Sequence, residues 1–249
     1  MTLGGPGYVP IAADYDGDGY TDYAVYHEST GYWFVMMSGS GGALIATQFG
    51  GVGFTAVPKD FDGDGKADPA LYGTVSGNWY VQLSGNGYSP VSLTGFGGPG
   101  FDPAAGDYDG DGKADPAIVS IASNALYAVR MSGSGYLGLA APFGGAGFVP
   151  VAGDYDGDRL VDPALYAESN GAWFFMLSHS GYGLTGVVFG GPGYTAVPGQ
   201  FDDDGITDVA VYQQSSGLWI VVLTGSGGSV VSTVLGGPGY TAVGPIRTH

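Results

Sequence analysis

The chain has no cysteine and few basic residues. Its 249 residues can therefore form neither a disulfide nor a thiolate metal site. Six lysines and arginines stand against 23 acids, giving a net charge of −17, which argues against nucleic-acid binding and against an anionic membrane surface. There is also no apolar run of about 18 residues, so we expect no membrane insertion.

Helical periodicity is missing as well. No segment keeps a 3.6-residue apolar period, and we expect almost no helix. The chain has 50 glycines, yet 44% of its residues are hydrophobic and 14% are aromatic, a composition unlike that of disordered chains. The glycines are better interpreted as turns between many short strands.

A tandem repeat organises the whole chain. A Gly-Gly pair, followed by an aromatic residue, returns every 46 or 47 residues and starts at Gly4, Gly50, Gly97, Gly144, Gly190 and Gly236. We predict one domain, 1–249, with five repeats at about 4–49, 50–96, 97–143, 144–189 and 190–235. A partial sixth repeat, 236–246, either clasps the ring against the first repeat or begins a further blade.

Each repeat is predicted to contain four short strands. In the second repeat these are expected at 55–61, 69–72, 79–83 and 91–96, separated by turns rich in glycine, serine and asparagine. Four strands in about 46 residues is typical of a propeller blade. We therefore predict an all-β, five-bladed β-propeller with four antiparallel strands per blade. An open β-solenoid is the rival architecture.

An acidic loop follows the first expected strand of every repeat. Aspartate stands at positions 1, 3, 5 and 9 of its nine residues, and these positions account for 19 of the 23 acids. Glutamine stands at position 1 of the fifth loop. The candidate ligands are Asp14, Asp16, Asp18 and Asp22; Asp60, Asp62, Asp64 and Asp68; Asp107, Asp109, Asp111 and Asp115; Asp154, Asp156, Asp158 and Asp162; and Asp202, Asp204 and Asp208.

So many carboxylates in one turn predict a bound cation. Two of them about 4 Å apart repel by about 1 kcal/mol in water and about 4 kcal/mol at an effective dielectric constant near 20. Ca²⁺ binds such oxygen sets, often with one backbone carbonyl, whereas zinc and copper prefer nitrogen or sulfur and Mg²⁺ demands a stricter octahedron. We expect up to five Ca²⁺ ions. The carbonyls expected at position 7 belong to Tyr20, Lys66, Lys113, Leu160 and Ile206.

A simpler interpretation is that Asp-Gly only forms a turn. A turn needs one such pair, not four carboxylates in a fixed register, so we favour the metal. The fourth and fifth loops depart from the pattern. Arg159 replaces a glycine in the fourth, and neutral Gln200 replaces the first aspartate of the fifth.

The loop pattern Asp-x-Asp-Gly-Asp-Gly-x-x-Asp between two short strands, with Phe-Gly-Gly before the blade, resembles the FG-GAP or VCBS repeats of integrin-alpha-like β-propellers. The resemblance extends over essentially the whole chain. It implies that the loop joins the first and second strands of a blade and binds Ca²⁺ through its aspartates and one carbonyl. Integrin-type propellers have longer blades and usually seven of them, so the resemblance does not predict the number of blades here.

Two sets of aromatic residues are candidates for sugar stacking. Trp33, Trp79, Trp173, Trp219 and Tyr127 share one repeat position, where we favour packing between blades over sugar binding. The better ligand candidates follow a Ser-Gly-x-Gly or related turn, where the first and last repeats have glycine. They are Tyr88, Tyr136 and Tyr182.

No catalytic set is evident. The three histidines fall at unrelated repeat positions, and Glu28 and Glu168 match in repeats expected to lie far apart, so a glycosidase is the least favoured function. We predict a non-enzymatic, calcium-binding module for adhesion or carbohydrate binding, with a glycan or a surface protein as partner. The alternative is a structural spacer in a larger surface protein. Calcium supply suggests an extracellular or cell-surface location, with any signal peptide outside this chain.

Overall fold

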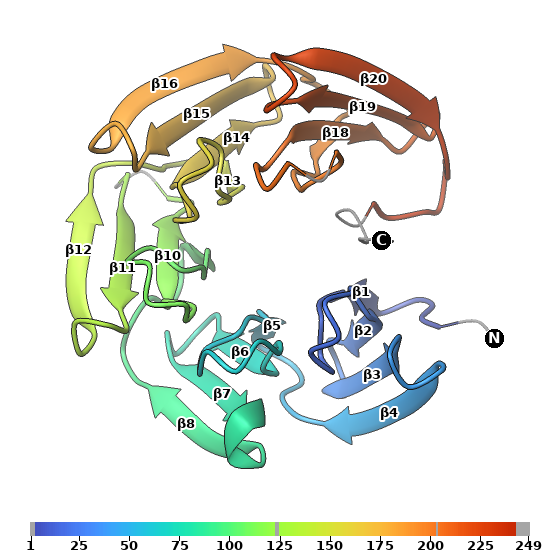
Figure 1. The fold of residues 1–249 in the computed structure, drawn as a ribbon, viewed down its shortest axis with the longest axis vertical. Helices are drawn as coiled ribbons and strands as arrows, with labels where there is room; N and C mark the ends of the chain where they lie inside the picture. The colour runs from blue at the N-terminus through green and yellow to red at the C-terminus, as the bar shows by residue number, and fades with distance from the viewer. Residues whose placement is uncertain (1–2, 123–124, 203, 243–249) are drawn as a thin grey trace.

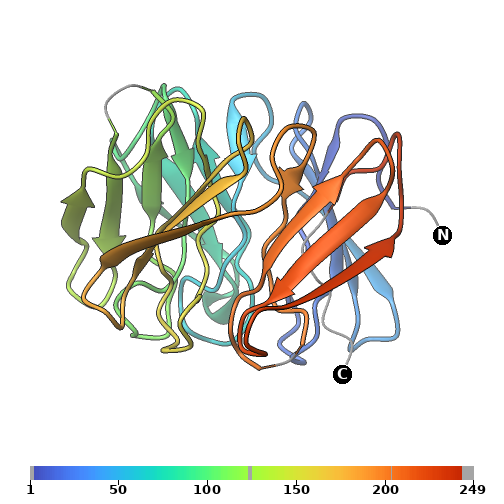
Figure 2. The same ribbon diagram turned by 90° about the horizontal axis from the view of Figure 1, so that it is seen from above.

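Five four-stranded sheets form a ring in the computed structural model, which describes residues 3–122, 125–202 and 204–242 (Figure 1). In each sheet the strands pair antiparallel in chain order. The first strand lies nearest the centre and the fourth at the rim (Figure 1). Turned by 90°, the twisted sheets stand side by side around the ring (Figure 2). The predicted five-bladed, all-β propeller is confirmed.

The inner strands have two or three residues, and the rim strands have five or six. Blades 1 and 2 contain β1 (Tyr8–Pro10), β2 (Tyr23–His27), β3 (Tyr32–Met37) and β4 (Ala43–Gln48), then β5 (Phe54–Ala56), β6 (Ala70–Gly73), β7 (Trp79–Leu83) and β8 (Ser89–Leu93). Blade 3 contains β9 (Phe101–Pro103), β10 (Ala117–Ser120), β11 (Tyr127–Met131) and β12 (Leu137–Ala141). Blades 4 and 5 contain β13 (Val149–Pro150), β14 (Ala164–Ala167), β15 (Ala172–Leu177) and β16 (Gly183–Val188), then β17 (Thr195–Ala196), β18 (Val209–Gln213), β19 (Leu218–Leu223) and β20 (Ser229–Val234).

The second blade shows where the expected strand limits were wrong. β7 matches its prediction, but β5 ends at Ala56 because the chain then leaves the sheet to enter the acidic loop. β8 begins earlier than expected, at Ser89, because the N–H of Tyr88 bonds to the carbonyl of Leu83 at 2.7 Å and closes the hairpin. One 3-10 turn, η1 (Ser84–Asn86), is the single helical element among the described residues.

The core is divided into layers between neighbouring blades. Four clusters of buried side chains fill the seams from blade 1 to blade 5. Trp33, Trp79 and Trp173 are at most 1% exposed. Each donates its indole N–H to a carbonyl at the end of its own blade's rim strand. These three rings therefore pack the seams and are closed to a sugar.

The partial sixth repeat, as far as it is described, caps blade 5. The N–H of Gly237 bonds to the hydroxyl of Tyr212 at 2.8 Å, and the side chain of Gln214 bonds to the carbonyl of Tyr240, also at 2.8 Å. At the ends of blades 1, 2 and 4, the N–H of the equivalent glycine likewise bonds to the hydroxyl of the equivalent tyrosine. Residues 243–246 of this predicted segment lie outside the described residues. Among those described, no helix is long and apolar enough to cross a membrane.

Candidate metal sites

The acidic loops join the first and second strands of their blades, and loops 1 to 4 fold around their own first aspartate. In the second loop, Asp60 accepts the N–H of Gly63 at 2.6 Å through one carboxylate oxygen and that of Gly65 at 2.8 Å through the other. Gly65, with φ of 86°, occupies the left-handed region that glycine adopts without strain. Loops 1, 3 and 4 repeat both bonds. The carboxylate at position 1 thus shapes the turn.

The aspartate at position 9 ties each loop to the hairpin between the third and fourth strands. Asp68 is 0% exposed, and its two oxygens accept the N–H groups of Phe61 at 2.8 Å and of Ser84 at 2.7 Å. The other four position-9 aspartates are equally buried and equally bonded. Burial raises the pKa of this carboxyl above its ordinary value, against the lowering effect of the N–H donors, in four loops, at Asp68, Asp115, Asp162 and Asp208.

The same hairpin holds the remaining carboxylates, a role that the sequence analysis missed. The hydroxyl of Ser84 lies 3.0 and 3.1 Å from the two oxygens of Asp64, and the N–H of Gly85 bonds to Asp62 at 3.0 Å. Equivalent bonds come from the hairpins of blades 1, 3 and 4. The recurring Ser-Gly pair was a visible signal, but it was interpreted only as a turn.

Four loops bring three carboxylates together. In each group, one oxygen per residue lies within 4.8 Å of the others. Loop 1 does so with positions 1, 3 and 5, and loops 2 to 4 with positions 1, 3 and 9. The groups are Asp14, Asp16 and Asp18; Asp60, Asp62 and Asp68; Asp107, Asp109 and Asp115; and Asp154, Asp156 and Asp162.

Position 5 is therefore outside the tight group in loops 2 to 4, although Asp64, Asp111 and Asp158 bond to the hairpin hydroxyl as Asp18 does in loop 1. All donors are oxygens, a set that suits Ca²⁺. Whether the carbonyls of Tyr20, Lys66, Lys113, Leu160 and Ile206 complete the ligand set stays a prediction.

Neighbouring loops touch one another around the ring. The N–H of Ala67, at position 8 of the second loop, bonds to the carbonyl of Asp14, at position 1 of the first, at 2.6 Å. The side chain of Lys66 covers Gly17, where an added Cβ would lie 3.0 Å away. The next three loop pairs make the same backbone bond. The backbone of each loop is thereby fixed against the loop that follows.

The two divergent loops differ in whether their acids come together. In loop 4, Arg159 adopts a φ of 74° and still donates its N–H to Asp154 at 2.8 Å, so the acids gather normally. In loop 5, buried oxygens of Gln200 and Asp202 have no hydrogen-bond partner. No group of three acids forms there among the residues that the structure describes.

The three candidate ligand tyrosines stand in a strained conformation. Tyr88, Tyr136 and Tyr182 have φ of 61°, 64° and 63°, where the equivalent Gly42 and Gly228 have 83° and 80°. A side chain in this region costs about 1–2 kcal/mol. Tyr88 and Tyr136 are nearly half exposed, whereas Tyr182 also lines a pocket between blades 3 and 4.

The ring of four-stranded sheets and its repeated acidic loops define a β-propeller. Residues 14–71 match the FG-GAP-like repeat, and this match, together with the five blades, supports FG-GAP-like propeller repeats in this chain. No curated protein matches its sequence.

Solved structures share the fold at low identity. A catalytically inactive virginiamycin B lyase from Staphylococcus aureus, with quinupristin, has 9% identity and a TM-score of 0.61, over 96% of this chain and 74% of the lyase. A streptogramin B lyase has 9% identity and a TM-score of 0.57, over 93% and 70%. An Agrocybe aegerita lectin that recognises non-reducing terminal N-acetylglucosamine has 17% identity and a TM-score of 0.60, over 91% of this chain and 65% of the lectin.

Proposed function

We propose that the chain is a calcium-stabilised, non-enzymatic binding module that works outside the cell. The gathering of three carboxylates in each of four loops carries the proposal. Every oxygen that already accepts one N–H keeps a further lone pair for a cation.

Thermal unfolding with millimolar Ca²⁺ and with a chelator tests this proposal. A site whose Kd lies about tenfold below the calcium concentration adds about 1.4 kcal/mol, because only the folded loop gathers the ligands. Four such sites should raise Tm by more than about 10 °C. Mg²⁺ at the same concentration is the control and should give a smaller shift. An unchanged Tm with calcium would contradict the proposal.

Carbohydrate is the ligand class that we favour for this module. Tyr88 and Tyr136 present half-exposed rings, held at an energetic cost at sites where two sister blades manage with glycine. The lectin with the same fold supports this choice, while the two lyases show that the fold by itself decides nothing about catalysis.

A glycan array probed in calcium separates carbohydrate binding from the spacer alternative. Binding that is lost in Tyr88→Ala and Tyr136→Ala, with Tm retained, would support the carbohydrate proposal. A folded, calcium-loaded chain that binds no glycan would favour the structural spacer.

A further inference from the structure

Blade 3 departs from its sisters at the centre of its sheet. Blades 1, 2, 4 and 5 pair a tyrosine with a tryptophan across their second and third strands, as Tyr26 pairs with Trp33. Blade 3 has Val119 and Tyr127 at these places, in the same register. A smaller ring thus stands where the other blades have an indole.

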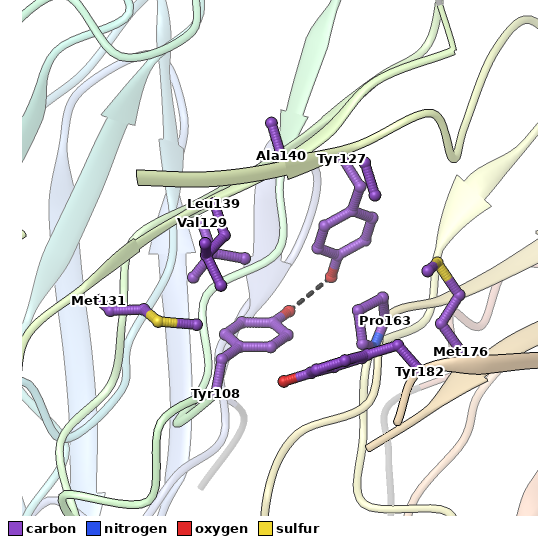
Figure 3. Close-up of a pocket in the computed structure, with 10 residues that line it drawn as sticks. Tyr108, Tyr127, Val129, Met131, Leu139, Ala140, Pro163, Met176 and Tyr182 are labelled. Carbon is purple, nitrogen blue, oxygen red and sulfur yellow. Dashed lines mark hydrogen bonds between the residues drawn. The ribbon is translucent and has the colours of Figure 1, made fainter. Parts of the chain in front are cut away.

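A cavity of about 230 Å³ lies at this seam, partly open to solvent. Blade 3 contributes Tyr108, Tyr127 and Met131, and blade 4 contributes Pro163, Met176 and Tyr182. The ring of Tyr182 lies beside Pro163 and faces the two other tyrosines (Figure 3). The walls are almost entirely carbon. For comparison, an engineered apolar cavity of about 150 Å³ is large enough to bind benzene.

One buried hydroxyl in this cavity lacks a donor. The hydroxyl of Tyr108 uses its single proton on the carbonyl of Ala104 at 2.6 Å. In the bond between the two hydroxyls, drawn in Figure 3, Tyr127 must therefore be the donor. Burial raises the pKa of both phenols above the ordinary value, which keeps them neutral. The oxygen of Tyr127 is left as an acceptor, and no described residue donates to it.

We propose that the seam between blades 3 and 4 binds a small, uncharged aromatic compound with one hydrogen-bond donor, of the size of phenol or indole. Carbon walls fit an aromatic ring, and the Tyr127 oxygen fits its single donor. No basic residue lines this cavity, so an anion would be buried without a counter-charge. A sugar would bury several hydroxyls without partners, at about 1–3 kcal/mol each. The pocket is thus distinct from the carbohydrate surface of Tyr88 and Tyr136.

The next seam provides an internal comparison. The equivalent cavity between blades 4 and 5 is wider, about 360 Å³, and has Gly228 where the first has Tyr182. Trp173, the equivalent of Tyr127, donates to the carbonyl of Phe189 at 3.0 Å and does not line that cavity. Tyr155, the equivalent of Tyr108, does line it and donates its proton to the carbonyl of Val151 at 2.5 Å, so its oxygen is an acceptor there. The two cavities therefore differ in their cover, which is a tyrosine in a left-handed conformation at the first and glycine at the second.

Binding of phenol and toluene, followed by NMR with the calcium-loaded chain, tests the proposal. Ligands of this size should bind in about the millimolar range. Phenol should bind about 5- to 10-fold more tightly than toluene, because only phenol donates to Tyr127. In Tyr127→Phe, which leaves the bond from Tyr108 to Ala104 intact, this preference should vanish while toluene binding stays.

Tyr182→Gly should weaken the binding of both phenol and toluene about tenfold or more, since the ring that covers the cavity is removed. Glycine is native at this place in blades 1 and 5, and Tm should change little because relief of backbone strain offsets the lost contacts. Tyr88→Gly and Tyr136→Gly make the same change at the other two hairpins and should leave binding unaltered. No saturable phenol binding, or binding insensitive to Tyr182→Gly, would overturn the proposal.

Discussion

The second and fifth acidic loops share aspartate at positions 3, 5 and 9, but they differ at position 1 as well as at positions 4, 7 and 8. Asp60 accepts two backbone N–H groups and belongs to a group of three acids, whereas the oxygen of Gln200 is buried without a partner. At position 9 the loops are alike, because Asp68 and Asp208 each accept one N–H from the loop and one from the hairpin.

The comparison separates two tasks of the carboxylates. Position 9 holds the loop against its blade, with or without a well-formed group of acids. Position 1 closes the turn and brings its neighbours together. A loop can therefore lose the geometry of a metal site and keep its place in the fold.

The largest effect should come from position 9. Asp115→Ala removes a buried acceptor and leaves two N–H groups without a partner, which costs about 2–4 kcal/mol, or roughly 5–15 °C in Tm. The matched variant Asp208→Ala should lose about the same amount in chelator, measured by thermal unfolding. With calcium present, Asp115→Ala should lose more Tm than Asp208→Ala, because it also removes a metal ligand. Equal losses of Tm in calcium would contradict the inference that loop 3 forms a metal site and loop 5 does not.

The sequence was sufficient to predict the blades because the same turn and loop signals recur in every repeat. The Gly-Gly spacing, the acidic turn and the Ser-Gly hairpin agree in all or nearly all copies, and a local pattern that recurs five times leaves few alternative folds. The acids at positions 1 and 3 were predicted as partners from spacing alone, and four loops bring them together.

What the sequence could not predict depends on contacts between distant segments. Ser84 reaches Asp64 across 20 residues, and Tyr182 of blade 4 meets Tyr108 and Tyr127 of blade 3. The substitution of tyrosine for tryptophan at position 127 was visible, but the cavity beside it depends on how two blades pack. The local pattern likewise gave no sign that position 5 leaves the tight group in three loops.

Exchanging position 1 between the two loops should have an intermediate effect. Asp60→Gln should lower the number of bound Ca²⁺ ions by one in a calorimetric titration and cost about 1–2 kcal/mol in chelator, because two bonds to a charged acceptor are weakened. Gln200→Asp should raise the number by one and stabilise the chain only when calcium is present. If neither exchange changed the number of bound Ca²⁺ ions, position 1 would not organise the site.

The smallest effect concerns loop 4, which keeps its acids together although Arg159 stands in the left-handed region where loops 1, 2, 3 and 5 have glycine. Arg159→Gly should raise stability by about 0.5–1 kcal/mol, a few degrees at most in Tm, through relief of strain. Arg159→Ala is the matched control, since it removes the same charge but keeps the strain. Both should tighten calcium binding modestly by removing a cation near the site, while only the glycine variant should gain Tm in chelator. If alanine gained as much, charge would be the cause, and the strained backbone of loop 4 would carry no measurable cost.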